Sequence, residues 1–166
     1  MAGQPRFLVD VNAGRLAKWL RILGYDTLFI PDADDDELLR VALREGRVIL
    51  TRDSRLMERR VVNTGQLAAL FIRDDDLRSQ LRQVVQAFRL AGLDLPPART
   101  GGLLSRCIRC NVPLVEVEKE AVAGRVPPYV YDTQAEFMEC PSCQRIYWQG
   151  THWANMRRDL AELGER

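Results

Sequence analysis

The sequence is poor in histidine, a frequent base in hydrolysis, and in lysine, a frequent contact to nucleic acids. It has one histidine, His152, and two lysines, Lys18 and Lys119. Hydrolytic chemistry in residues 1–151 therefore has to proceed without an imidazole base. The formal net charge is +1, so overall charge does not indicate a nucleic-acid-binding protein. Arginine suits phosphate binding, but a general bias in composition explains its abundance equally well.

Long hydrophobic runs are also absent. No apolar stretch approaches the ~18 residues of a membrane span, and the start, MAGQPRFLVD, has no apolar core of a signal peptide. We therefore expect a soluble, cytoplasmic protein with no membrane partner. The 166 residues, of which 46% are hydrophobic and 28% charged, allow one ordinary globular domain and a small appendage.

Cysteine is sparse, and its spacing indicates metal binding rather than disulfides. Two C-x-x-C pairs are separated by 29 residues: Cys107 with Cys110, and Cys140 with Cys143. Thiolates on two such turns can complete a tetrahedron around one Zn²⁺. A redox pair or chance could explain a single pair, but two matched pairs, flanked by β-like runs at 114–117 and 145–148, favour a structural zinc ribbon. The gap exceeds the usual spacing, and Pro127 and Pro128 suggest that the excess loops out.

Short apolar runs alternate with amphipathic segments before the cysteines. Strands are predicted at 6–9, 26–30, 48–50 and 67–72. Nearly continuous apolar runs are typical of strands buried on both faces of a parallel sheet, and helices between them form right-handed βαβ crossovers. Asn12 is expected to cap the first helix, while Gly24 and Gly46 end the first two. The clearest amphipathic helix runs from Leu77 to Phe88.

A segment rich in proline and glycine, GLDLPPARTGGL at 92–103, is typical of a linker. The predicted organisation is a first domain at 1–92, a linker at 93–103 and a ribbon that ends in a helix at 104–166.

Acidic residues gather where the predicted strands end. Asp10 follows the first strand, Asp53 follows the third, and Asp34, Asp35 and Asp36 open the helix between them. If the strands are parallel, these groups meet at one edge of the sheet, where clustered carboxylates need a cation. Hard oxygen ligands suit Mg²⁺ or Mn²⁺, with Asp10 and Asp53 as the first candidate ligands. The simpler alternative is that these acids only cap helices.

Basic and aromatic side chains offer possible RNA contacts. Arg15, Lys18 and Arg21 are spaced three apart and could hold backbone phosphates beside the acids, or could form an ordinary solvated helix face. In the ribbon, Tyr147, Trp148 and Trp153 are candidates for stacking on bases.

These motifs together resemble the Mut7-C RNase domain family, a branch of the PIN-like nucleases. The resemblance rests on FLVD, GRLAKWLRILGYDT and DADDDELLRVALREGRVILTRD, and continues through the cysteine pairs to YWQGTHW. It implies an α/β fold, a PIN-like Rossmannoid three-layer parallel sheet followed by a small zinc-ribbon domain.

The resemblance also implies metal-dependent cleavage of RNA by clustered acids. Asp10 and Asp53 match the family's strand-end acids, and we assign the helix-opening acid to Asp35, with Asp36 as the next candidate. The family's frequent fourth acid would be Asp74 or Asp75.

Two other functions compete with this interpretation. A phosphotransfer receiver also has acids after its first and third strands, but it needs a second acid directly after the first and a lysine later in the domain. Here Val11 follows Asp10, and no lysine lies between Lys18 and Lys119. The second alternative is a catalytically inactive RNA-binding or ribosome-associated adaptor. A protein partner is possible, and the sequence does not identify one.

Overall fold

The computed structural model describes residues 3–90 and 105–150, with Ala154, Asn155 and Arg158. The predicted linker at 93–103, and most of the predicted C-terminal helix, lie outside the described residues. Within the described part, no helix has the length and apolarity that crossing a bilayer requires.

The first part of the chain forms a four-stranded parallel sheet, as predicted. Its strands are β1 (Phe7–Val9), β2 (Thr27–Phe29), β3 (Val48–Thr51) and β4 (Ala69–Phe71). They pair in the order β2-β1-β3-β4, and every neighbouring pair is parallel. All four carboxyl ends therefore lie at one edge.

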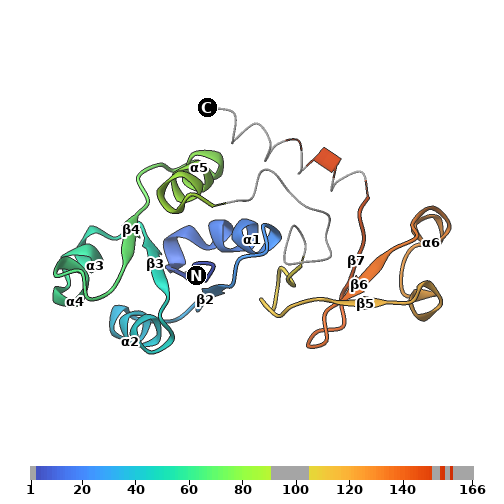
Figure 1. Ribbon diagram of the computed structural model, residues 1–166, viewed down its shortest axis with the longest axis horizontal. Coiled ribbons are helices and arrows are strands. Elements are labelled where there is room, and N and C mark those ends of the chain that lie inside the picture. Colours follow the sequence, from blue (N-terminus) through green and yellow to red (C-terminus); the bar gives the residue numbers. More distant parts are fainter. Residues whose placement is uncertain (1–2, 91–104, 151–153, 156–157, 159–166) are drawn as a thin grey trace.

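Helices cover both faces of the sheet, which gives the predicted three layers. The helices are α1 (Gly14–Ile22), α2 (Asp35–Glu45), α3 (Ser54–Glu58), α4 (Arg60–Asn63) and α5 (Leu77–Phe88). Side chains alternate along β1, so that Phe7 and Val9 pack with α1 and α5, while Leu8 packs with the other three helices. Figure 1 shows α5 and α2 on opposite sides of the strands.

The start of the first helix differs from the prediction. Asn12 does not cap α1; it lies in a short 3₁₀ turn, η1 (Val11–Ala13), whose cap is the Asp10 carboxylate, and α1 begins without a side-chain cap. The segment after Asp53 forms two short helices, because Arg59 has an extended backbone between them. Gly24 and Gly46 have positive φ angles, as the predicted helix ends require.

The second part is an antiparallel three-stranded ribbon. It contains β5 (Val115–Val117), β6 (Phe137–Glu139) and β7 (Ile146–Tyr147), in that order. The expectation that the gap between the cysteine pairs loops out was wrong. The gap holds β6, the 3₁₀ turn η2 (Lys119–Val122) and α6 (Pro128–Thr133), in which Pro128 occupies the first helical turn. Val122, Val126, Val130 and Phe137 form a small core there.

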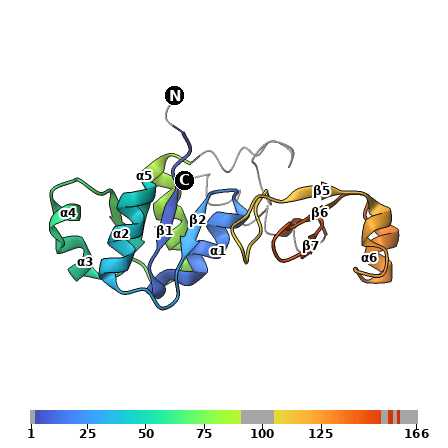
Figure 2. The same cartoon turned by 90° about the horizontal axis from the view of Figure 1, so that it is seen from below.

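The ribbon is joined to the sheet through the β2 edge. Asn111, directly after the first cysteine pair, accepts a hydrogen bond from the Thr27 backbone N–H at 2.9 Å and donates to Asp26 Oδ1 at 2.7 Å. From α1, Arg21 donates to the carbonyl oxygens of Thr27 and Ile108, both at 2.8 Å. Figure 2 shows the ribbon continuing from the α1 and β2 side of the sheet.

Asp26 is the charged centre of this junction. Burial raises the pKa of its carboxyl, but hydrogen bonds from Arg47 and Asn111 more than offset this and lower the pKa from 3.8 to about 2. A depressed carboxyl pKa stabilises the folded state above the unfolded-state pKa. The contribution of Asp26 is therefore complete above pH 3.8 and is lost as the pH falls through about 2.

Apolar packing also crosses the junction. Cys107, Cys140 and Tyr147 belong to the same buried cluster as Phe7 and Leu20 of the sheet and α1. The two parts are distinct in secondary structure, yet the ribbon extends the apolar core of the first.

Asn111 offers a direct test of the junction, because Gln144 is its counterpart after the second cysteine pair. Both residues have a left-handed backbone, with φ of 62° and 63°. Asn111→Gly should lower the free energy of unfolding by about 1–3 kcal/mol, since buried polar groups on β2 lose their partner. Gln144→Gly should cost nothing, because Gln144 is exposed and glycine suits this backbone conformation. Urea unfolding, with metal content measured in parallel, checks both; equal losses would contradict a stabilising role for the junction.

Candidate active site and metal centre

The predicted strand-end acids lie at the switch point of the sheet. The chain leaves β1 toward β2 on one side and leaves β3 toward β4 on the other, although β1 and β3 are neighbours. Open α/β sheets bind ligands outside the carboxyl ends of strands at such a point. Asp10 follows β1 and Asp53 closely follows β3, so both acids are at this position.

A hydroxyl group connects the two acids. Thr51, fully buried at the end of β3, donates a hydrogen bond to Asp10 Oδ2 at 2.8 Å and accepts one from the Asp53 backbone N–H at 3.0 Å. The other Asp10 oxygen accepts from the Val11 N–H at 2.6 Å. Asp10 is 5% exposed. Its carboxylate is therefore fixed in one orientation relative to the chain that leads to Asp53.

Asp53 also caps α3, as the simpler alternative predicts. Its Oδ1 accepts a hydrogen bond from the Arg55 N–H at 2.9 Å. An ionised carboxylate has several lone-pair positions on two oxygens. Capping through one oxygen is thus compatible with a second role for the other.

The three acids at the start of α2 have different surroundings. Asp34 caps the helix by accepting from the Glu37 N–H at 2.8 Å. Burial, followed by the charges of Asp53 and Asp10, raises the pKa of the Asp35 carboxyl. A hydrogen bond and ion pair with Arg59 lower the pKa of Asp36 instead. Asp35 is thus close enough to both strand-end acids for their charges to raise the pKa of its carboxyl.

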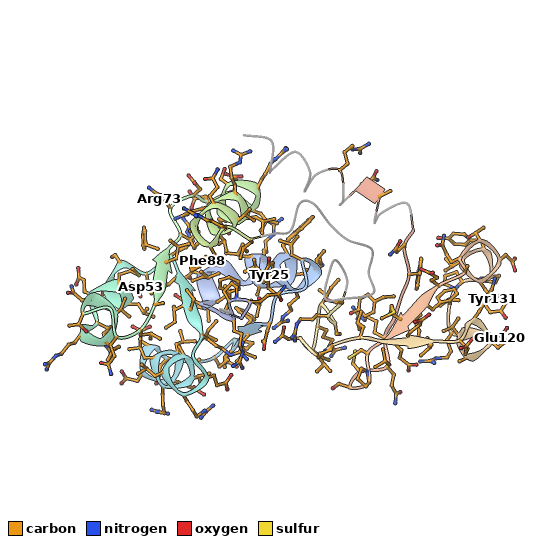
Figure 3. The ribbon with its side chains drawn as sticks, viewed as in Figure 1. Tyr25, Asp53, Arg73, Phe88, Glu120 and Tyr131 are labelled. Carbon is orange, nitrogen blue, oxygen red and sulfur yellow. The ribbon has the colours of Figure 1, made fainter. Side chains whose placement is uncertain are left out.

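The acids after β4 serve other contacts. Asp76 caps α5 through the Ser79 N–H at 2.9 Å. Asp75 forms an ion pair with Arg52, and Asp74 lines a hollow beside Arg73. Figure 3 shows Arg73 and Asp53 in the same α/β part of the molecule, whereas Glu120 and Tyr131 lie at the far end of the ribbon.

The basic stripe is divided by the structure. Arg15 and Lys18 are exposed on α1. Arg21 is buried, and its guanidinium donates to backbone carbonyls of β2 and of the first cysteine turn. Arg21 is therefore part of the junction between sheet and ribbon, and the possible phosphate-binding surface on α1 consists of Arg15 and Lys18 alone.

The aromatic side chains of the ribbon are also less available than expected. Tyr147 is buried, and its hydroxyl lies 3.1 Å from Cys107 Sγ and accepts from the Ile108 N–H at 3.2 Å. Trp148 is half-buried against the small ribbon core. Tyr147 therefore has no free ring face for stacking on a base, and Trp148 is only partly accessible for it. Trp153 lies outside the described residues.

The four cysteines converge on one point. Their sulfur atoms all lie within 4.8 Å of one another, and Cys107 Sγ is 3.7 Å from Cys143 Sγ. Both turns have the same construction: the Cys110 N–H donates to Cys107 Sγ at 3.3 Å, and the Cys143 N–H donates to Cys140 Sγ at 3.5 Å. The set is positioned to bind a metal ion, and four thiolates in this arrangement fit a structural Zn²⁺.

Donors around Cys107 favour its thiolate form. Burial raises the pKa of this thiol, but hydrogen bonds from the Tyr147 hydroxyl and from the backbone N–H groups of Cys110 and Arg109 outweigh burial and lower the pKa from 9.0 to about 6. Thiolates are the form that ligates metals.

The carboxylates are spaced more widely than the thiolates. In the part of the chain that the structure describes, the cysteines are the one group of three or more potential ligands that converges so closely. Mg²⁺ commonly retains several water ligands and binds through one or two carboxylates. A hydrated ion therefore fits acids that lie near one another without meeting at a single point.

Sequence reasoning missed several residues of the site and the junction. Thr51 lies just after the predicted strand at 48–50, although a hydroxyl two residues before an acid at a strand end is a usable signal. Asn111 directly follows the first cysteine pair. Nothing local in the sequence shows that its side chain meets β2, because Thr27 is 84 residues away.

A parallel sheet with acids at its switch point, joined to a four-cysteine ribbon, is the arrangement of a nuclease-like domain with a metal-binding ribbon. Among known families, the Mut7-C RNAse domain matches this chain over residues 5–160. The chain belongs to this family, and the match spans both the sheet and the ribbon. No curated protein and no solved structure matches it.

For the cysteine centre we expect one zinc ion per chain. Cys140→Ser should lose the ion and the ribbon structure. The four-stranded sheet should remain folded with lower stability, because Cys107 and Cys140 contribute to the shared core. Elemental analysis, and hydrogen exchange of β1–β4 against β5–β7, measure the two effects. A native protein without zinc, or with a Cys107–Cys110 disulfide, would contradict this assignment.

Proposed function

We propose that this protein is a divalent-metal-dependent ribonuclease whose centre is Asp10, Asp35 and Asp53. The observation that carries the proposal is the gathering of carboxylates from three segments at the carboxyl ends of β1 and β3. The Thr51 hydroxyl joins Asp10 to the Asp53 backbone, and burial, followed by the charges of Asp53 and Asp10, raises the pKa of Asp35. Negative charges that repel one another weaken the fold unless a cation compensates them. Two nearby arginines are paired with other acids, Arg59 with Asp36 and Arg52 with Asp75, and of these Arg59 offsets part of the effect on Asp35.

The donor set indicates which cation this is. Carboxylate oxygens suit Mg²⁺ or Mn²⁺ rather than the softer ions that thiolates select. When bound, such an ion supplies an activated water and neutralises charge on the phosphate. This chemistry needs no imidazole, in keeping with the absence of histidine before His152.

Each acid would then have a defined task. Asp10, fixed by Val11 and Thr51, orients the ion relative to the sheet. Asp53 and Asp35 hold it, directly or through water, from the starts of α3 and α2. The exposed Arg15 and Lys18 would hold phosphates of the RNA backbone on the α1 side.

Replacement of each acid by asparagine tests the centre, since it removes charge while keeping size. Asp10→Asn, Asp35→Asn and Asp53→Asn should each reduce cleavage of labelled single-stranded RNA by about a hundredfold or more. Asp36→Asn is the matched control, because Asp36 adjoins Asp35 but is paired with Arg59. Its cleavage rate should stay within a few-fold of wild type.

The assay should use zinc-loaded protein cleared of other divalent ions, with Mg²⁺ or Mn²⁺ added back. Cleavage without added metal, or survival of cleavage in the Asp10→Asn, Asp53→Asn double variant, would refute the proposed centre. If Asp36→Asn abolishes cleavage and Asp35→Asn does not, the helix-opening acid is Asp36. No cleavage with any metal would favour an RNA-binding adaptor.

Thr51 should act as a positioning residue for the acids. Thr51→Val removes the hydroxyl that joins Asp10 to the Asp53 backbone while keeping the side-chain volume. We expect a lower kcat, by about tenfold, with KM for RNA nearly unchanged, because the variant misplaces the centre without altering phosphate contacts. Thr51→Ser should restore most of the rate. If serine fails to do so at equal stability, Thr51 matters only for packing.

A further inference from the structure

A cavity of about 420 Å³ opens beside the acids, on the α1 and α5 side of the switch point. Its walls come from three segments: η1 with the start of α1, Arg52 after β3, and Asp75 with the start of α5. This volume is within the range of small-molecule sites.

We propose that this cavity binds one nucleotide of single-stranded RNA, the one that adjoins the phosphate to be cleaved. The proposal rests on the ribonuclease function proposed above. It adds a substrate subsite formed by Val11, Asn12, Arg15 and Arg52.

The position of the cavity follows from the alternation of side chains at the strand ends. Thr51 bonds to Asp10 on the side of the acids, whereas Arg52, the next residue, lines the cavity. Val11, directly after Asp10, lines it as well. The residues next to Asp10 and Asp53 thus form a second compartment, and one RNA strand could occupy both.

Arg52 has unused capacity to bind an anion. Its Nε is buried and has no hydrogen-bond partner among the described residues. Its Nη2 pairs with Asp75, whose side chain is 89% exposed. A buried donor without a partner is costly, and a phosphate oxygen would satisfy it with a charge-assisted bond. Arg15 supplies a second guanidinium to the cavity lining.

The remaining lining fits a nucleoside better than a bare anion. Val11 is 42% exposed and offers an apolar surface to a ribose or base. The exposed amide of Asn12 can donate to and accept from a base edge. Single-stranded RNA is recognised through such contacts to unstacked bases.

A second hollow, of about 310 Å³, lies farther along α5 and is lined by Arg73 and Arg82. Arg82 Nε is also buried without a partner in the described residues. No residue adjacent to Asp10 or Asp53 lines this hollow. It is the competing location for a nucleotide, and the test must separate the two.

Substitution of Asp75 should affect nucleotide binding in the opposite direction to substitution of Arg52. In the free protein the Asp75 carboxylate is paired with Arg52, and its negative charge opposes an incoming phosphate. Asp75→Asn should therefore tighten nucleotide binding by about two- to fivefold, the value of a surface ion pair. Arg52→Gln should weaken binding by about tenfold. Arg55→Gln is the matched control, since Arg55 is exposed near Asp53 and does not line the cavity.

The experiment titrates zinc-loaded protein, without Mg²⁺ or Mn²⁺, with adenosine and uridine 5′-monophosphate and with inorganic phosphate. Backbone amide shifts in the NMR spectrum locate the ligand, and the same titrations give the affinity of each variant. We expect shifts at Val11, Arg15 and Arg52, tighter binding of nucleotides than of phosphate, and no effect of Arg55→Gln.

Several results would overturn the subsite. Amide shifts at Arg73 and Arg82 instead of at Val11, Arg15 and Arg52 would place the nucleotide in the other hollow. Equal affinity for phosphate and for nucleotides, or no binding by the wild type, would also contradict the subsite. So would an Arg52→Gln variant that binds nucleotides as tightly as the Arg55→Gln variant. Failure of the ribonuclease proposal alone gives a different result. Nucleotides would then bind the cavity as expected, but no metal would support RNA cleavage. If Asp75→Asn abolishes cleavage, Asp75 is a fourth acid of the centre rather than a residue that opposes phosphate binding.

Discussion

The parallel pairing of β1 with β3 is the constraint on which the site depends. Val9 lies opposite Leu50, and the Asp10 N–H continues the ladder by donating to the Leu50 carbonyl at 3.0 Å. This register brings the Asp10 carboxylate to the Thr51 hydroxyl. A shift of one residue would turn Asp10 to the other face, because side chains alternate along a strand. Asp10 would then lie on the side of the cavity and away from the Thr51 hydroxyl.

The sheet also determines how the ribbon is held. β2 is an edge strand, and an edge exposes backbone groups that tend to pair with other chains. Here the Asn111 side chain accepts a hydrogen bond from one such group, the Thr27 N–H. Asp26 links the same asparagine to the buried Arg47. The ribbon thus protects the edge at this position. A segment that looks like a separate domain in the sequence completes the surface of the first.

Features that depend on local pattern could be predicted from the sequence. Strand-end acids and paired cysteines are such features, because strand spacing and C-x-x-C geometry act over a few residues. Arg21 shows where this reasoning fails. Each step of three residues turns about 60° short of a full helical turn, so Arg21 lies about 120° from Arg15 and points to the buried side. Helix α6 was missed for another reason, since Pro128 is typical of a turn but is also favoured in the first turn of a helix.

The two cysteine turns share one backbone design and differ in the residue that comes directly after each. Asn111 is attached to the sheet by two hydrogen bonds, whereas Gln144 is exposed. Among the described residues, the elongated ribbon in Figure 1 meets the sheet at the end that carries Asn111, whereas α6 and the 70% exposed Tyr129 lie at its other end. A small rotation at the junction would therefore displace α6 farther than it displaces the cysteine turns. The contacts of Asn111 and Arg21 at the junction thus determine how accurately α6 is placed relative to Asp10 and Asp53.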